Sequence, residues 1–581
     1  MSKLNVDQKS IKDLLEYKKA DFLIPDYQRP YAWEEKECQT LWDDIFSFAF
    51  PDNDYSKFDR DNDEYYLGPI VTFKNEDGKQ EVIDGQQRLT TIMLLLRSFY
   101  DMFLNMKDDG SRNIRETIER CLWKTGELGE IDKEALKISS EVATENDNEE
   151  FRAILRDGVA TKEQNSKYAQ NFRFFQKKIE GFLKEYPSYF QYLPSRILQN
   201  CILLPIEAES QDTALRIFST LNDRGKPLSD ADIFKAQFYK FFSKIGKKDD
   251  FVATWKMLEE MCQGIFHTSA SASMDELFTR YMYFERAKSG NKSSTTEALR
   301  KFYERNGYEV LKSEETFNNL TLLAKFWSDV SNQNKEVFSE RVLRRLFVLN
   351  YAPNGMWTYF VSVYYMQNKD AENKLDEGKF YDFLNKITAF IWAYAFTNPG
   401  LNALRTPVYA EMVNLVSGKP VEFNDYKFDA DMLLKILNDY NFSNIRPITK
   451  SMLAWWAFDN KEYQSLLSLE TVFEIEHIYA RKRYEKEKSL SSKALLESLG
   501  NKSLLEKTVN IRATDYRLVD KKQYYDGFIT SNKQYKKGTD IAELKEIALK
   551  ADFLESDIEA RKKKIFSSFI DFLKRNDLIK Q

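Results

Sequence analysis

Residues 83–91 read Ile-Asp-Gly-Gln-Gln-Arg-Leu-Thr-Thr and predict the end of a strand, a tight turn and the start of a helix. The stretches at 65–73 and 80–83 predict two strands, and the Asp-Gly pair at 77–78 is typical of a hairpin turn. Gly85 permits a backbone turn that a residue with a side chain resists. We therefore expect a hairpin that runs directly into a helix, in an N-terminal region that mixes strands and helices.

The same turn is a candidate anion site. The first backbone N–H groups of a helix have no partner within the helix, so they attract phosphate. Arg88 offers a two-pronged donor to phosphate oxygens, and Asp84 offers an oxygen to a cation. Gln86 and Gln87 can read polar edges. A nucleotide and a DNA phosphate suit these groups equally well, and a plain strand-to-helix turn is the simplest alternative.

A second candidate site lies at residues 473–478, Phe-Glu-Ile-Glu-His-Ile, which predict a strand ending near a histidine. The chain has only two histidines, and His267 has no acidic neighbour, so we interpret it as structural. The other histidine, His477, directly follows Glu476, so a carboxylate and an imidazole are adjacent. Glu476 can hold a hard cation such as Mg²⁺ or Mn²⁺, and neutral His477 can take a proton from an attacking water. A buried structural histidine is the alternative for His477.

Two asparagines downstream complete this pattern. A predicted short strand at 503–505 follows Gly500 and Asn501, and a predicted helix starts near Asn510. The amide of Asn501 can fix the tautomer of His477, and that of Asn510 can complete a metal shell with Glu476. Strand, hairpin and helix would then surround a single cation that stabilises charge on the phosphate.

Charge is distributed unevenly along the chain. The net charge of the 581 residues is −5, but residues 471–581 hold 24 Lys and Arg against 18 Asp and Glu. We expect a polyanion to meet this C-terminal part, although a solvated basic face would give the same count. The candidate DNA-binding residues are Arg481, Lys482, Arg483, Lys502 and Arg512.

Composition narrows the class of protein. The low Gly (20) and Pro (13) counts favour long helices, and 246–465 reads as helix after helix without a chemical motif. Four cysteines without a Cys-x-x-Cys pair suggest buried free thiols in a reducing cytoplasm. We expect no signal peptide and no membrane span, because the apolar run at 387–396 is about half the length that a bilayer requires. The predicted domains are 1–245, 246–465 and 466–581.

The C-terminal constellation resembles the HNH (ββα-metal) nuclease module. Three N-terminal stretches, at 24–33, 83–91 and 218–228, resemble the N-terminal domain of GmrSD-type, modification-dependent (type IV) restriction endonucleases, whose C-terminal half is also an HNH module. The resemblance covers both ends of the chain in the right order and does not extend over 246–465. One departure is Ala480, where such modules often have proline.

The resemblance implies an α+β, predominantly helical protein with a ParB/sulfiredoxin-like N-terminal domain, a helical middle and an HNH nuclease domain. It implies His477 as general base, Asn501 as its orienter, and Glu476 and Asn510 as metal ligands. It also implies that the N-terminal domain binds and hydrolyses an NTP and senses modified DNA. The implied nucleotide-binding residues are Asp84, Gly85, Gln86, Gln87, Arg88, Arg29, Tyr27, Asn222, Arg224 and Lys226.

The expected function is that of a cytoplasmic anti-phage DNA endonuclease in which nucleotide or modified DNA licenses a metal-dependent nuclease. One alternative is a nucleotide-switched DNA-binding regulator with a degenerate nuclease. Another is a non-specific nuclease that cripples the infected host by abortive infection. The expected partners are DNA, including modified phage DNA, a nucleotide and further defence subunits. A homodimer would make a double-strand cut easier for a chain with one nuclease site.

Overall fold

The computed structural model describes residues 5–142, 145–210, 213–214, 217, 229–266, 270–400, 402–459, 464–513 and 517–580. The chain is α+β and mostly helical, as the sequence predicts. It divides into two compact units, Met1–Val252 and Ala253–Gln581. The division into three domains at 245 and 465 stays a prediction.

The first unit is built on a seven-stranded mixed sheet, with β2 paired to β9 beside the order β1-β9-β4-β5-β3-β8. Strand β4 pairs antiparallel with β5 and parallel with β9, so the hairpin expected at 65–83 is confirmed at the centre of the sheet. The strands are β1 (Asn5–Val6), β2 (Lys9–Ser10), β3 (Phe22–Ile24), β4 (Tyr65–Lys74), β5 (Gln80–Asp84), β8 (Ile138–Ser140) and β9 (Cys201–Ala208).

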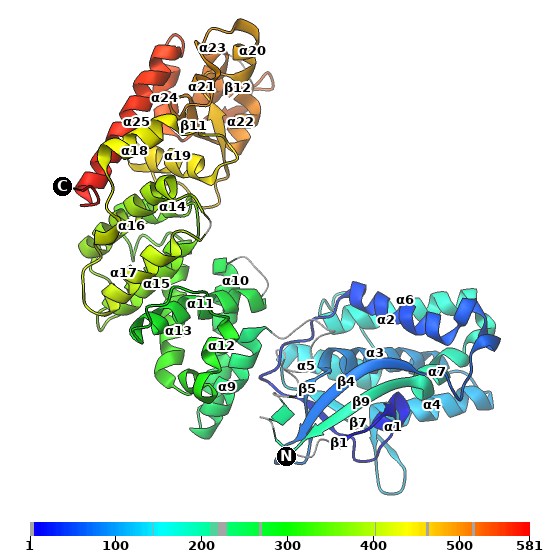
Figure 1. Cartoon of the computed structure of the whole chain (residues 1–581). Helices are drawn as coiled ribbons and strands as arrows, with labels where there is room; N and C mark the ends of the chain where they lie inside the picture. Colours follow the sequence, from blue (N-terminus) through cyan, green and yellow to red (C-terminus); the bar gives the residue numbers. More distant parts are fainter. Residues whose placement is uncertain are drawn as a thin grey trace. The chain divides into compact units, whose positions relative to one another are not determined.

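Helix α3 (Gln86–Phe103) is the central helix of this unit and follows β5 after a single residue. Almost all of its residues are buried, because α4, α5 and α6 pack around it (Figure 1). The other helices of this unit are α1 (Ile11–Leu15), α2 (Glu35–Ala49), α4 (Asp109–Leu122), α5 (Glu145–Asp157), α6 (Lys167–Glu185), α7 (Tyr192–Asn200) and α9 (Asp230–Lys244).

The sequence also predicts that the first twenty residues and most of 107–200 are helical, and the described residues of both stretches are partly extended. Residues 5–20 form β1, β2 and the short helix α1. Within the predicted helical region 107–200, strands β6 (Trp123–Thr125) and β7 (Ile131–Leu136) form a hairpin. Gly129, at a positive φ of 93°, makes this turn, and the backbone N–H of Gly126 closes it by donating to the carbonyl of Glu130. The glycines at 126 and 129 therefore favour a hairpin turn in a region whose charge pattern predicts a helix.

The second unit begins with a helical region that matches the pattern predicted for 246–465. The predicted buried helix at 387–396 lies in α16, and no helix in the described ranges is long and apolar enough to cross a membrane. The helices are α10 (Lys248–Phe266), which crosses the unit boundary, α11 (Ala270–Lys288), α12 (Leu299–Tyr303), α13 (Glu314–Ser331), α14 (Glu340–Leu349), α15 (Met356–Asn368), α16 (Glu377–Thr397), α17 (Arg405–Val416), α18 (Ala430–Asp439) and α19 (Pro447–Asp459).

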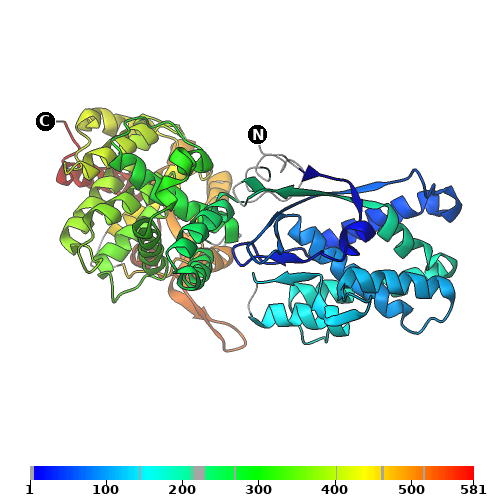
Figure 2. The ribbon, with the colours of Figure 1, turned by 90° about the horizontal axis from the view of Figure 1, so that it is seen from below.

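The end of the chain folds around a two-stranded antiparallel sheet, β10 (Phe473–His477) with β11 (Lys502–Glu506), which places His477 opposite Lys502. Helix α22 (Lys507–Ala513) follows β11 directly, so both predicted strands and the helix near Asn510 are confirmed. The long C-terminal helix α25 (Glu555–Arg575) packs on the turn Leu499–Asn501, which leads into β11. The hairpin of β12 (Gly527–Ile529) and β13 (Tyr535–Lys537) extends away from its unit (Figure 2). The other helices are α20 (Arg481–Glu487), α21 (Lys493–Leu496), α23 (Leu518–Asp526) and α24 (Ala542–Ala548).

Candidate functional site

The turn between β5 and α3 requires glycine. Gly85 has a φ of 87° and occupies the N-cap of α3, where it provides no side-chain cap. A Cβ at this position would lie 3.0 Å from the carbonyl oxygen of Pro69 and 3.0 Å from Cγ1 of Ile70. The backbone of β4 therefore approaches the turn closely, and the N–H groups at the start of α3 have no capping side chain.

The two glutamines of the turn bind the chain itself. The amide oxygen of Gln87 accepts the backbone N–H of Ala32 at 2.6 Å, and its Nε2 donates to the carbonyl of Pro30 at 3.1 Å. Nε2 of Gln86 donates to Oε1 of Gln28 at 3.2 Å. These buried bonds join the motif at 83–91 to the segment at 24–33, which the sequence analysis grouped with it. Gln87 is thus an internal brace, because both ends of its amide have protein partners.

Charged groups remain beside this turn. A guanidinium N–H of Arg88 donates to the carbonyl of Pro69 at 3.0 Å, and the guanidinium lies against Gly68. Burial raises the pKa of Asp84, while the Gly85 N–H and the charges of Arg88 and Arg29 oppose the rise. Burial lowers the pKa of Arg88, and the charge of Asp84 opposes that change. The structure therefore brings Asp84, Arg88 and Arg29 together at one electrostatic centre.

Tyr27 has a mainly structural setting. Its hydroxyl donates to Oε2 of Glu81 at 2.8 Å, and its ring packs against Tyr239 in a small apolar cluster. The other predicted nucleotide-binding residues, Asn222, Arg224 and Lys226, lie outside the described residues, and so does His267.

In the second unit, His477 is the last residue of β10 and is buried. Its Nε2 forms no hydrogen bond, and the closest carboxylate oxygen paired with it, Oε1 of Glu497, is 3.6 Å away. Glu497 also contacts Arg481 at 3.1 Å and Lys502 at 2.5 Å. Burial, followed by the charges of Lys502 and Arg481, lowers the pKa of His477 to about 4, although Glu497 acts in the opposite direction. The imidazole is therefore neutral at pH 7, the form that accepts a proton.

Asn501 positions the backbone beyond His477, and the predicted contact with the ring is not made. Its Oδ1 accepts the N–H of Tyr479 at 2.7 Å, and its Nδ2 donates to the carbonyls of Tyr479 and Leu496 at 3.0 Å each. Its backbone carbonyl accepts the N–H of Ile478 at 2.9 Å. The side chain is fully buried, so every bond of the amide is used to fix the exit of β10.

The two predicted metal ligands have protein partners. Oε1 of Glu476 accepts a hydrogen bond from Nζ of Lys521 at 2.6 Å and from the hydroxyl of Tyr525 at 2.7 Å. The Lys521 ammonium also donates to the carbonyl of His477 at 2.6 Å. Asn510 donates instead to Oε2 of Glu474, at 2.6 Å. Glu476 and Asn510 are therefore not assembled into one cation site.

This arrangement does not fit the predicted cation at Glu476, because an ammonium already neutralises the carboxylate. Within the described residues, no group of three or more His, Cys, Asp and Glu side chains could hold a metal ion. The buried pair instead ties α23 to the end of β10.

The predicted DNA-binding residues fall into two groups. Arg481 and Lys482 are exposed at the start of α20, and Arg512 is partly exposed on α22. Arg483 is buried and holds both carboxylate oxygens of Asp552 at 2.7 Å. Lys502 is fully buried, with its ammonium on Glu497 and the carbonyl of Phe442. The charges of Arg483 and Lys502 are therefore paired with carboxylates of the chain itself, and DNA binding by the five residues stays a prediction.

Sequence reasoning missed Glu497, Lys521 and Tyr525. Glu497 lies three residues before Gly500, so its position beside the strand entry was visible in principle. Lys521 and Tyr525 are four residues apart and therefore share one face of α23, but no local pattern shows which strand that face meets.

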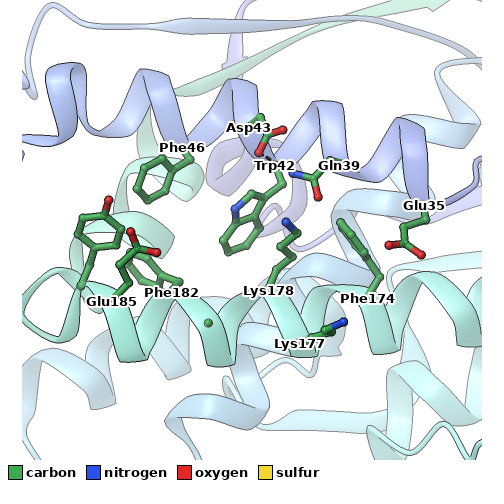
Figure 3. A pocket seen from close by; sticks show the side chains of 12 residues that line it. Glu35, Gln39, Trp42, Asp43, Phe46, Phe174, Lys177, Lys178, Phe182 and Glu185 are labelled. Carbon is green, nitrogen blue, oxygen red and sulfur yellow. Dashed lines mark hydrogen bonds between the residues drawn. The ribbon is translucent and has the colours of Figure 1, made fainter.

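The first unit also contains a groove of about 520 Å³ between α2 and α6. Figure 3 shows Trp42, Phe174 and Phe182 between the two helices, with lysines and carboxylates around them. None of the predicted nucleotide-binding residues lines this groove. It is therefore separate from the turn at Gly85.

Two family models match the chain. The model for the GmrSD restriction endonuclease N-terminal domain matches residues 11–239, and that for the GmrSD restriction endonuclease C-terminal domain matches residues 423–568. Both candidate sites therefore lie inside matched regions. No curated protein matches the chain.

Proposed function

Since the chain belongs to the GmrSD family of restriction endonucleases, and is thus a nuclease of phage defence, we propose that it cuts DNA at the end of strand β10 with His477 as general base. The supporting observation is the neutral, buried imidazole whose Nε2 forms no hydrogen bond. Nε2 faces the Glu497 carboxylate at 3.6 Å, beyond hydrogen-bond distance, so no protein donor occupies the lone pair that would accept the proton.

In the proposed reaction, Nε2 of His477 takes a proton from a water molecule, whose oxygen forms a bond to phosphorus. The bond between phosphorus and the leaving sugar oxygen breaks, and that oxygen gains a proton. Glu497, at 3.6 Å, stabilises the imidazolium that forms. Arg481 and Lys482, exposed directly after the strand, attract the phosphate backbone.

Mg²⁺ or Mn²⁺ remains the cofactor that the HNH resemblance suggests. A divalent cation at Glu476 would compete with Lys521 for the same oxygen, so this site is not ready for a metal ion in its present form. Omission of divalent ions from a cleavage assay tests the requirement directly. His477-dependent cutting in EDTA would remove the metal from the proposal.

The N-terminal unit is proposed to bind an NTP or modified DNA at the turn between β5 and α3 and to license cutting. The uncapped start of α3 and the cluster of Asp84, Arg88 and Arg29 support this proposal. Gln86 and Gln87 would act by holding the turn in shape, since their amides bind the chain itself.

Cleavage assays test the whole proposal. The wild type and the His477→Ala variant would be incubated with plain and modified phage DNA, with Mg²⁺ or Mn²⁺, and with or without each NTP. Cutting that requires His477 and either a modification or an NTP supports a gated restriction enzyme. Cutting that the His477→Ala variant retains in full refutes the assignment of the general base.

One observation favours a second candidate, a nucleotide-switched DNA-binding regulator with a degenerate nuclease. It is the ammonium of Lys521 on Glu476, where the HNH resemblance implies a metal ligand. DNA binding without nicking under any divalent ion, in both the wild type and a Lys521→Met variant, would support this candidate over the nuclease.

A further inference from the structure

A cavity of about 530 Å³ lies in the second unit between the C-terminal end of α18, the segment around α21, and α25. Figure 1 shows α18 and α25 running close together near the C-terminus. Glu497, the carboxylate closest to Nε2 of His477, forms part of the cavity wall. Phe442, whose carbonyl accepts from Lys502, forms another part. Glu497 therefore lies between the cavity and His477, the proposed general base, and contacts both.

The lining combines aromatic rings, lysine ammonium groups and an amide with two carboxylates, those of Asp439 and Glu497. Tyr440 and Phe566 provide aromatic surface, and the guanidinium of Arg446 lies 4.9 Å from the centre of the Tyr440 ring. Lys493 and Lys562 provide ammonium groups, and no carboxylate among the described residues forms an ion pair with either. The exposed side chain of Asn441 provides an amide donor and acceptor.

We propose that this cavity is a substrate subsite that takes one nucleoside unit of the DNA strand, next to the phosphate presented to His477. A base can stack on the aromatic wall, and an amide can meet its polar edge. The lysines meet the flanking phosphates, because unpaired ammonium groups are natural partners of a polyanion. The volume lies within the range of ordinary ligand pockets.

This inference rests on the proposed nuclease site, but binding can be measured without cleavage. The test uses the full chain in the His477→Ala background, so that a fluorescently labelled 12-nucleotide DNA stays intact. Fluorescence anisotropy at one fixed salt concentration gives the dissociation constant. Separate cleavage assays with the histidine restored report on the nuclease.

Neighbouring lysines on α25 provide a matched pair. Lys562 lines the cavity, whereas Lys563 is exposed and does not. We expect Lys562→Ala to weaken binding about fivefold and Lys563→Ala to change it less than about twofold. Equal losses in both variants would show a merely basic surface and would overturn the subsite.

Two exposed alanines provide a second pair that depends on shape. Ala494 lines the cavity and Ala560 lies on α25 outside it. We expect Ala494→Trp to fill the cavity and weaken binding about tenfold, while Ala560→Trp binds as the parent does. Unchanged binding in both tryptophan variants overturns the proposal, and the lysine pair decides it if Ala494→Trp does not fold.

The two proposals fail separately. If the restored chain cuts nothing while the matched pairs differ in binding, the nuclease assignment falls and the subsite stands. If cutting requires His477 and the matched pairs bind alike, the nuclease stands and the subsite falls.

Discussion

Two strand ends of this chain carry the predicted chemistry, and they use their polar side chains differently. At the end of β5, both amide ends of Gln87 bind the segment at 24–33. At the end of β10, Glu476 and Asn501 are bound in the same way, but Nε2 of His477 forms no hydrogen bond. A buried amide or carboxylate must find a partner within the protein, so its presence in a motif indicates architecture as readily as function. The ring nitrogen of His477 instead faces a carboxylate 3.6 Å away, so no protein donor occupies its lone pair.

The largest expected effect concerns this nitrogen. His477→Ala should lower the cleavage rate by about 10²–10⁴-fold, the usual contribution of a general base, and leave the fold intact. A single-turnover assay with saturating enzyme measures it. His267→Ala provides the control for losing a histidine, and an equal loss in that variant would contradict the assignment.

The next effect concerns the carboxylate beside it. Lys521→Met should destabilise the chain by about 3–5 kcal/mol, because the charge of Glu476 is left buried and unpaired. The double variant Glu476→Gln with Lys521→Met should recover most of that loss. Urea unfolding of the intact chain measures both, and Lys374→Met, which breaks the exposed pair with Glu372, is the control. A small effect of Lys521→Met would show that Glu476 is available to a cation.

The stability of the second unit should also depend on pH through His477. Its pKa is about 4 in the folded chain and about 6.5 when unfolded, so the unfolded state binds more protons between these values. The free energy of unfolding is therefore at its full value above about pH 6.5 and decreases as the pH falls toward 4, by about 3 kcal/mol. The difference in unfolding free energy between the wild type and His477→Asn, at pH 7 and pH 4.5, isolates it. A difference that does not change with pH would show that the imidazole is not held neutral.

A smaller effect should appear at the other strand end. Gln87→Ala leaves the Ala32 N–H and the Pro30 carbonyl without their partner, which costs about 1–3 kcal/mol. Gln39→Ala, which removes an exposed amide bond to Asp43 on α2, should cost much less. Thermal unfolding compares the two. If Gln87→Ala instead abolishes NTP binding at full stability, Gln87 reads the ligand and the contrast between the two strand ends disappears.

Local sequence predicted much of the secondary structure around both sites. The hairpin at 65–83, the start of α3 and the strands flanking His477 follow from alternation, glycine placement and apolar runs. These signals are local, because backbone geometry imposes a period of two or 3.6 residues on buried positions. They failed at 123–140, where short strands lie in a charged region without clear alternation.

The partners of the polar side chains were not predictable in this way. Lys521 is 45 residues from Glu476, and Phe442 is 60 residues from Lys502, and no periodicity relates such positions. The amino-acid sequence determined which groups are available at each strand end: a histidine beside a glutamate, and glycine and arginine at a turn. The tertiary fold determined that Lys521 of α23 lies on Glu476, and that Glu497, just after α21, lies 3.6 Å from Nε2 of His477. A buried charge or amide takes whichever partner the fold brings within about 3 Å, and that choice is made only when distant segments meet.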